Sequence, residues 1–469
     1  RLADVAAVTG GRLHRATGAE RVTSVEFDSR DVTPGALFLA LPGERADGHA
    51  FAAAAAAAGA AAVLAGREVD APAVIAPPAA PGDLGANSYL AATDRDGAGA
   101  AVLTALARLA GHAVRALPAT AVIGVTGSSG KTTTKDLLAA VLSPLGPTVA
   151  PPGSFNNELG LPWTALRAGP DTRHLVLEFS ARGPGHIAGL AAAVPPRVGV
   201  VLNVGSAHLG EFGSRAAVAA AKGELVAALP ADGVAVLNAD DPAVAAMAER
   251  SAARVTWFGT GSEPEVRAED VVLDAGRPRF TLVAPAGSAE VALRLVGRHQ
   301  VGNALAAAAV GLELGGTPAG VAAALSAAVP GSRWRMELTR RPDGVTVLND
   351  AYNANPESMR AALQALVAIG GRRTWAVLGA MGELGPDAGA AHAGVAQAAR
   401  ELGVDRLVAV GTADYPGARR VCDVDDAVDL LHAELAPGDV VLVKASRVVG
   451  LERVAAALLE PAADGAATR

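Results

Sequence analysis

A short glycine-rich loop between an apolar strand and a helix constrains this chain more than any other feature. Residues 121–126 (Ala-Val-Ile-Gly-Val-Thr) predict a buried strand, residues 127–130 (Gly-Ser-Ser-Gly) form the loop, and a helix is expected over residues 131–141. Backbone N–H groups in such a loop converge at the helix N-terminus, where they bind phosphate. Lys131 would then reach the terminal phosphates of a nucleotide, and the Thr132 hydroxyl would hold magnesium.

The loop is a variant of the strict Walker pattern, which requires glycine five positions before Gly130. Val125 stands there instead, between Gly124 and Gly127. A loop that binds no nucleotide is the alternative, but the strand before it and the helix after it favour phosphate binding. The residues that we expect to contact ATP here are Gly127, Ser128, Ser129, Gly130, Lys131, Thr132 and Thr133.

The length of 469 residues exceeds what one hydrophobic core usually supports, so two or three domains are expected. Turn-rich segments divide the chain into residues 1–118, 119–330 and 331–469. The first block mixes short apolar runs with turns and lacks a motif for nucleotide hydrolysis. The stretch over residues 50–66 is uncharged but too short and too rich in alanine and glycine for a membrane span, and we interpret it as helix, turn and buried strand.

The second and third blocks both show the pattern of an α/β domain. Near-continuous apolar runs predict strands of a sheet covered on both faces, at residues 174–179, 198–204 and 234–238 of the second block. A polar, β-like section over residues 271–295 predicts an antiparallel edge, followed by a helix over residues 302–314. In the third block, helices alternate with strands at residues 345–349, 374–378, 406–410 and 440–444. That alternation is typical of a Rossmann-like domain, but a Gly-x-Gly-x-x-Gly fingerprint is missing there, which argues against a dinucleotide.

Charge and cysteine content exclude several classes of partner. The formal net charge is −7 and no Lys/Arg tract is present, which argues against nucleic acid and against an anionic membrane surface. Cys422 is the single cysteine, so the chain has no internal disulfide framework and fits a reducing cytoplasm.

Lysine is rare in this sequence, and its positions point to chemistry. Only four of the 40 basic side chains are lysine: Lys131, Lys135, Lys222 and Lys444. Arginine is a permanently charged fork, whereas the lysine amine can lose its proton and be modified. We therefore expect the lysines to mark functional positions, with Lys135 the weakest case.

A second cluster of candidate residues follows the strands of the second block. Glu178 ends one apolar strand and His208 follows the next, so both lie where parallel strands deliver ligands and could share a magnesium ion. A hydrogen-bonded loop histidine is the alternative for His208. Lys222 follows on an expected helix, and a lysine beside a metal is repulsive unless it becomes a carbamate, which is an anionic ligand.

The chain resembles the Mur ligases of peptidoglycan synthesis over nearly its whole length. The segments that carry the resemblance are residues 27–30, 42–49, 125–135, 153–162, 203–214, 297–303, 349–358 and 443–447. Among family members, they are most similar to the ligase that adds a D-alanyl-D-alanine dipeptide. Two small departures occur: Phe179-Ser180 stands where the family often has methionine and glycine, and Ala380 stands where many relatives have glutamate.

The resemblance implies specific roles for residues across all three blocks. It places Lys131, Lys222 and His208 in catalysis, and Thr132, Glu178, His208 and Lys222 (as a carbamate) around magnesium. Its further ATP contacts are Asn303, Arg335, Asp350, Asn353 and Asn355. Its contacts to the UDP-linked substrate are Ser29, Arg30, Gly48, His49, Asn156 and Asn157. From the residues alone, Asp350, Asn353 and Asn355 could equally cap the helix that starts near Pro356, and Lys444 could be a plain strand-end charge.

The fold and activity implied are those of a three-domain α/β ligase. A small N-terminal domain would bind the uridine nucleotide, a central P-loop ATPase-like domain with a mostly parallel sheet would bind ATP and magnesium, and a Rossmann-like domain would complete the site. The implied reaction adds D-alanyl-D-alanine to UDP-N-acetylmuramoyl-tripeptide through an acyl phosphate, giving the pentapeptide precursor, ADP and phosphate. A cytoplasmic monomer with small-molecule substrates, no nucleic acid and no membrane span is expected.

Three alternatives stay open at this point. The sister ligase that adds the third amino acid shares the first-block motifs, but the Asp-Asn-Pro-Arg sequence of its diaminopimelate-adding members is missing. A folate polyglutamate ligase would carry its phosphate loop much nearer the N-terminus. A nucleotide-gated scaffold without turnover is the third, and the retention of Lys131, Thr132, Glu178, His208 and Lys222 argues against it. The third peptide residue, lysine or a diaminopimelate isomer, is left undecided.

Overall fold

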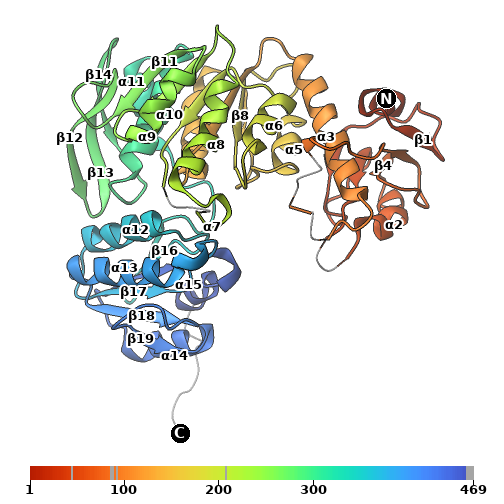
Figure 1. Ribbon diagram of the computed structural model, residues 1–469. Helices are drawn as coiled ribbons and strands as arrows, with labels where there is room; N and C mark the ends of the chain where they lie inside the picture. Colours follow the sequence, from red (N-terminus) through yellow and green to blue (C-terminus); the bar gives the residue numbers. More distant parts are fainter. Residues whose placement is uncertain (44–45, 85–88, 91–92, 206–208, 461–469) are drawn as a thin grey trace.

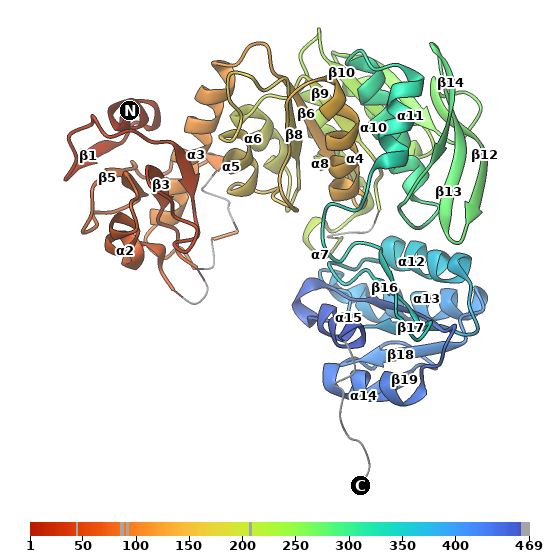
Figure 2. The same cartoon turned by 180° about the vertical axis from the view of Figure 1, so that it is seen from behind.

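Three α/β units follow one another along the chain, each built on its own sheet (Figure 1). The computed structural model describes residues 1–43, 46–84, 89–90, 93–205 and 209–460. Both views place the central unit between the other two (Figures 1 and 2). The three-domain α/β architecture expected from the sequence is confirmed, while the boundaries at residues 118 and 330 stay predictions.

The first unit has a five-stranded sheet in the order β1-β5-β4-β3-β2, parallel except for β1. Its elements are α1 (Leu2–Thr9), β1 (Arg12–His14), β2 (Ser24–Glu26), β3 (Ala36–Leu39), η1 (Gly48–Phe51), α2 (Ala52–Ala57), β4 (Ala62–Ala65), β5 (Ala73–Ile75) and α3 (Ala98–Arg115). The helix, turn and buried strand expected over residues 50–66 are confirmed by α2 and β4. The long helix α3 leads into the central unit.

The central unit has a nine-stranded sheet in the order β14-β13-β12-β11-β10-β9-β6-β8-β7. Its strands are β6 (Ala121–Thr126), β7 (Thr148–Val149), β8 (His174–Glu178), β9 (Val198–Val201), β10 (Val234–Asn238), β11 (Arg254–Gly259), β12 (Val266–Asp274), β13 (Arg277–Ala284) and β14 (Gly287–Ala292). The α-helices are α4 (Lys131–Leu142), α5 (Gly160–Ala165), α6 (His186–Ala193), α7 (Leu209–Phe212), α8 (Arg215–Ala227), α9 (Pro242–Ala245), α10 (Gln300–Glu313) and α11 (Pro318–Ala327). In this sheet order, all neighbouring strands from β12 to β7, β6 included, pair in parallel. Strands β12, β13 and β14 form the antiparallel edge that the polar section predicts.

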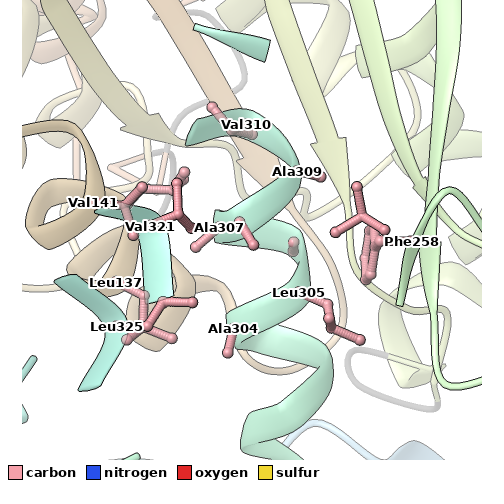
Figure 3. Close-up of a cluster of buried hydrophobic side chains, with 14 of the residues drawn as sticks. Leu137, Val141, Phe258, Ala304, Leu305, Ala307, Ala309, Val310, Val321 and Leu325 are labelled. Atoms are coloured by element: carbon pink, nitrogen blue, oxygen red, sulfur yellow. The ribbon is translucent and has the colours of Figure 1, made fainter. Parts of the chain in front are cut away.

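Helix α10 forms the centre of the largest core. Its alanines at 306–309 are fully buried, and they keep the helix thin enough for neighbours to approach on several sides. Figure 3 shows α10 between Leu137 and Val141 of α4, Val321 and Leu325 of α11, and Phe258 of β11. This packing fixes α4, which starts at the phosphate loop, against the rest of the unit.

The third unit has a six-stranded sheet in the order β15-β16-β20-β17-β18-β19, parallel except for β15. Its elements are β15 (Glu337–Arg340), β16 (Thr346–Asn349), α12 (Pro356–Ile369), β17 (Thr374–Leu378), η5 (Gly385–Asp387), α13 (Ala388–Glu401), β18 (Arg406–Val410), β19 (Arg419–Val421), α14 (Val424–Glu434), β20 (Val440–Lys444), η6 (Arg447–Val449) and α15 (Glu452–Leu459). One hydrophobic cluster packs α12 and α13 on one face of the sheet, and a second packs α14 and α15 on the other. The Rossmann-like prediction is confirmed. Among the described residues, no helix combines the length and hydropathy needed to cross a bilayer.

Three aromatic rings join the first unit to the central unit. Phe27 contacts Phe155 and Trp163 at ring-centroid distances of 5.9 and 5.5 Å, and Phe155 contacts Trp163 at 5.0 Å. The indole Nε1–H of Trp163 also donates to the carbonyl of Val25 at 2.7 Å. This joint sets the position of the first unit relative to the loop that carries Phe155.

We expect Trp163→Ala to raise the KM for a substrate that spans the first and central units by about three- to tenfold. The change removes two ring contacts, each worth about 0.5–1.5 kcal/mol, and one hydrogen bond, so the joint loosens. Steady-state kinetics with varied UDP-linked substrate measure the effect. Trp163→Phe keeps the ring contacts, so its KM should lie close to the wild-type KM. Equal KM values for wild type and Trp163→Ala would contradict this role.

Candidate active site

The phosphate loop lies where the strand order of the central sheet reverses. Strand β6 is flanked by β8 on one side and β9 on the other, although both follow it in the chain. The loop at residues 127–130 follows β6, Glu178 ends β8, and Asn203 follows β9. Ligands of open α/β sheets bind at such a switch point, at the carboxyl ends of the strands. The predicted convergence of the phosphate loop and Glu178 is therefore present.

The loop is held by its own lysine and by an asparagine from the next strand. Lys131 Nζ donates to the carbonyl oxygen of Gly127 at 2.7 Å. The Asn203 side chain accepts from Ser129 N at 3.0 Å and donates to the Ser129 carbonyl at 3.2 Å. Lys131 is half-buried at the cavity wall, and burial lowers its pKa to about 8, so the amine stays largely charged at neutral pH.

Gly130 permits a close approach between the loop and helix α10. Its φ of +83° lies in the left-handed region that favours glycine, and a Cβ atom there would lie 2.4 Å from Asn303 Oδ1. The Asn303 amide also donates to Gln300 Oε1 at 2.8 Å, which holds it in place.

Gly130→Ala should weaken ATP binding at least tenfold. The methyl group strains the backbone and pushes Asn303 from the loop, so the ring of N–H donors no longer converges. Equilibrium binding of a fluorescent ATP analogue measures the loss. Gly302→Ala is the matched control, because no atom lies within 4 Å of a Cβ there; wild-type affinity in Gly130→Ala would contradict the prediction.

Glu178 lies at the centre of a buried oxygen-rich cluster. Its Oε2 accepts from Thr132 Oγ1 at 3.3 Å, Ser154 Oγ at 3.4 Å and Asn156 Nδ2 at 3.3 Å. Its Oε1 is buried with no hydrogen-bond partner among the described residues. A buried carboxylate oxygen without a partner beside hydroxyl groups fits a hard cation such as Mg²⁺. The described part of the chain brings no three His, Cys, Asp or Glu side chains together, and His208, the further predicted ligand, lies outside the described residues.

Lys222 on α8 is 4% exposed. Burial, reinforced by the charge of Lys131, lowers its pKa well below the ordinary lysine value. Its amine makes no hydrogen bond or ion pair within the described ranges. The neutral amine is the form that reacts with carbon dioxide, so the predicted carbamate is chemically compatible with this position.

The third unit contributes a buried ion pair. Lys444 at the end of β20 pairs with Asp350, which follows the neighbouring strand β16, and donates to the Asn353 carbonyl at 2.8 Å. Asp350 also accepts from Met336 N at 3.1 Å. Lys444 is thus more than a plain strand-end charge. Asn355 does cap α12, by accepting from Ser358 N at 2.8 Å, so the capping interpretation holds for that residue.

A cavity of about 360 Å³ joins the central unit to the third. Arg335, whose guanidinium lies 4.0 Å from the Tyr352 ring centroid, lines it from the segment between the two units. The predicted ATP contacts on its wall are Ser128, Ser129, Gly130, Lys131, Thr132, Thr133, Asn303, Arg335, Asp350, Asn353 and Asn355. Gly127 does not line the cavity, but its carbonyl oxygen accepts the hydrogen bond from Lys131 Nζ.

The predicted contacts to the UDP-linked substrate fall in two places. Asn156 and Asn157 line the same cavity, and Asn157 Oδ1 also accepts from Gly160 N, the first residue of α5, at 2.9 Å. The other four, Ser29, Arg30, Gly48 and His49, lie on the first unit and do not line it. Burial alone would raise the pKa of Asp47, but hydrogen bonds from His49 and Arg67 lower it to about 2. The same carboxylate positions the His49 ring, since Asp47 Oδ1 lies 2.7 Å from His49 Nδ1.

Several residues of the site were missed by sequence reasoning. Asn203, which holds Ser129, follows a parallel strand just as Glu178 does, so the same rule could have found it. Lys135, by contrast, was singled out from the sequence as the weakest of the four lysines; it is buried, pairs with Asp136 and donates to the Pro151 carbonyl at 2.8 Å, so it has a structural role in this region. No pattern in the sequence indicates that His186 and Arg182 also line the cavity.

Three family models match the chain. "Mur ligase family, catalytic domain" matches residues 21–113, "Mur ligase middle domain" residues 125–311, and "Mur ligase, glutamate ligase domain" residues 334–447. The chain is 54% identical to the UDP-N-acetylmuramoyl-tripeptide–D-alanyl-D-alanine ligase of Mycobacterium bovis, covering 98% of this chain and 97% of that one. The corresponding Escherichia coli ligase is 36% identical over 93% of this chain and 94% of its own length.

Solved structures of MurF enzymes are also similar to this chain. A crystal structure of MurF from Acinetobacter baumannii superposes with a TM-score of 0.85 at 31% identity, covering 98% of both chains. The Thermotoga maritima MurF ligase in complex with ADP superposes with a TM-score of 0.77 at 30% identity, covering 93% of this chain and 97% of that one.

Proposed function

The chain belongs to the Mur ligase family, and on that premise we propose that it is the ATP-dependent ligase that adds D-alanyl-D-alanine to UDP-N-acetylmuramoyl-tripeptide. The products are the UDP-linked pentapeptide precursor of peptidoglycan, ADP and phosphate. Full-length similarity to ligases of that name supports the substrate assignment. The observation in this chain that carries the proposal is the cavity in which the phosphate loop faces the Asp350–Lys444 pair across the two units.

Activation of a carboxylate is the chemical problem, because forming an amide in water is unfavourable. The tripeptide carboxylate attacks the γ-phosphate of ATP, which gives an acyl phosphate and ADP. The dipeptide amine then attacks the acyl carbon and loses a proton, and phosphate leaves. Catalysis of this kind depends on positioning and charge neutralisation.

The residues of the cavity supply these two effects. Lys131 and the N–H groups of the phosphate loop bind the phosphates, and Asn303 keeps that loop in shape. Asp350, with Lys444 beside it, binds the nucleoside from the third unit. Magnesium, when bound, neutralises phosphate charge; Thr132, Glu178, His208 and the Lys222 carbamate would hold it.

Contact between the central and third units excludes water from the reacting atoms. Gly210 N in α7 donates to the Glu383 carbonyl of the third unit at 3.1 Å, and both views show α7 beside that unit (Figures 1 and 2). Hydrolysis of the acyl phosphate is the side reaction that this contact suppresses. We place the reaction in the cytoplasm, in keeping with ATP as substrate and with Cys422 as a free, exposed thiol, and expect a monomer.

Phosphate release by the purified protein tests the function. With ATP, magnesium and UDP-N-acetylmuramoyl-tripeptide, we expect release with D-alanyl-D-alanine and none with single amino acids. Release with a single amino acid and UDP-N-acetylmuramoyl-dipeptide would identify the sister ligase instead. No release with any acceptor would favour a scaffold without turnover.

A further inference from the structure

Glu383 is a residue of the cavity wall whose side chain the proposed mechanism does not use. It lies in the loop over residues 379–385, which follows β17 at the same sheet edge as Lys444 of β20. The residue is exposed, lines the cavity and carries the single charged side chain of this loop. Because the carboxyl ends of parallel strands carry the ligand-binding groups of such sheets, this position indicates a substrate contact.

The backbone of Glu383 has a conformation that glutamate rarely adopts. Its φ of +62° lies in the left-handed region, which costs free energy for a residue with a Cβ atom. Its carbonyl accepts from Gly210 N of α7 at 3.1 Å, and a Cβ at Gly210 would lie 3.0 Å from that same oxygen, so the two segments approach closely. Glycine at position 383 would adopt this backbone freely. The presence of glutamate there indicates a use for its side chain.

Buried polar side chains hold the rest of this loop in place. Three of them, each less than a tenth exposed, form hydrogen bonds with its backbone. The pairs are Tyr415 Oη with the Gly379 carbonyl (2.8 Å), His392 Nε2 with Met381 N (2.9 Å) and Ser446 Oγ with Gly382 N (2.7 Å). The rings of His392 and Tyr415 also contact each other, at a centroid distance of 5.0 Å. A loop supported in this way holds Glu383 at a set position on the cavity wall, as a preorganised binding group requires.

The Glu383 carboxylate lies close enough to the phosphate loop to act on its lysine. Burial is the main cause of the lowered pKa of Lys131, and the charges of Glu178 and Glu383 oppose that shift. Lys131 and Glu383 line the same cavity, one from the central unit and the other from the third. In the proposed reaction the acyl phosphate forms beside Lys131. Glu383 therefore lies on the wall of the space that the acceptor amine must enter.

The charges of the reactants decide which group a carboxylate can bind here. It repels the phosphates of ATP, the carboxylate of the tripeptide and the carboxylate of the dipeptide. The cations are magnesium, which the cluster around Glu178 on the central unit fits, the side-chain ammonium of the tripeptide, and the ammonium of the dipeptide. The tripeptide comes from the side of the first unit, whereas Glu383 belongs to the third. The dipeptide ammonium is also the one whose nitrogen must reach the reacting carbon.

We propose that Glu383 binds the ammonium group of the incoming dipeptide and so places the acceptor nitrogen beside the acyl phosphate. The inference rests on the proposed function, and it assigns the acceptor subsite to the loop over residues 379–385. The Glu383 carboxylate accepts a hydrogen bond from the ammonium. A charged hydrogen bond of this kind is worth about 10- to 100-fold in affinity.

Steady-state phosphate release with each substrate varied in turn tests the subsite. Glu383→Gln keeps the side-chain shape but loses the charge, so the KM for D-alanyl-D-alanine should rise about 10- to 100-fold. The KM values for ATP and for UDP-N-acetylmuramoyl-tripeptide should stay within about threefold of wild type. Glu383→Asp keeps the charge on a shorter side chain and should recover part of the loss. Glu401→Gln, on an exposed glutamate of α13 that accepts from Gln397, is the control.

An acceptor analogue without the amine separates recognition from folding. Propionyl-D-alanine has the shape of the dipeptide but lacks the ammonium, so it can inhibit the reaction but cannot be ligated. Its inhibition constant should be the same in wild type and in Glu383→Gln. An inhibition constant that rises in the variant together with the dipeptide KM would show that the substitution disturbs the loop, and that result would overturn the proposal.

Other results would overturn it as well. A wild-type KM for D-alanyl-D-alanine in Glu383→Gln would show that the carboxylate does not bind the acceptor. A higher KM for the UDP-linked tripeptide alone would place the side-chain ammonium of that substrate at Glu383. A higher magnesium requirement with an unchanged dipeptide KM would assign Glu383 to the metal. No ligation of D-alanyl-D-alanine by wild type would instead contradict the proposed function.

Discussion

Replacing Lys131 by methionine is expected to lower kcat for ligation by about 10²- to 10³-fold. The change keeps most of the side-chain volume but removes a positive charge at the cavity wall that, in the proposed mechanism, lies against the phosphates. One preorganised donor at a developing charge is worth about 3–4 kcal/mol in a site that excludes water. In the free protein Lys131 is bound to its own loop through the Gly127 carbonyl, so part of the loss should also appear as weaker ATP binding.

Phosphate release under saturating ATP measures this loss, and a parallel binding titration separates affinity from turnover. Lys131→Arg keeps the charge but replaces a compact amine by a planar fork, and we expect it to recover less than a tenth of wild-type kcat. Both variants should keep the wild-type melting temperature within a few degrees, because Lys131 makes one hydrogen bond to the protein. A methionine variant with wild-type kcat would show that phosphate charge is balanced elsewhere.

The strands that could be predicted from sequence are those buried on both faces. Residues 121–126, 234–238, 374–378, 406–410 and 440–444 form strands with the expected bounds, since a continuous apolar run flanked by turn residues has few other solutions. The strand expected over residues 198–204 ends at Val201, because the residues after it turn to deliver Asn203 to the phosphate loop. Helix α3 was not predicted: half of its residues are alanine or glycine, and its N-cap Gly97 gives no capping hydrogen bond.

The residues of the site also differ in whether the sequence could predict them. Residues in a local motif, such as the phosphate loop, could be placed from sequence because the chemistry requires their spacing. Contacts between distant segments could not: Asn203 with Ser129, Lys444 with Asp350, and Glu158 with His186 each depend on which strands and helices become neighbours. The rarity of lysine was an independent indication of important positions, because all four lysines lie buried or half-buried in the central unit or at the cavity wall.

Lys222→Ala is expected to lower kcat at least 100-fold, and short carboxylic acids should restore part of it. The amine is buried on α8, and that burial and the charge of Lys131 lower its pKa, which favours the neutral form that reacts with carbon dioxide. A carbamate would place a negative charge near Lys131, whose own positive charge disfavours an ammonium at this position. Alanine leaves a space that acetate or propionate can fill with the same carboxylate chemistry.

Activity of Lys222→Ala is measured against increasing acetate and propionate, with chloride at matched ionic strength as the control. Lys222→Arg keeps a permanent charge that cannot be carbamylated and leaves no space for an acid, so it should stay inactive throughout. A ¹³C carbamate resonance in wild type supplied with labelled bicarbonate, absent in both variants, would report the modification without reference to turnover. Full activity of Lys222→Ala without added acid would exclude the carbamate, and the buried amine would then need another explanation for its position beside the phosphate loop.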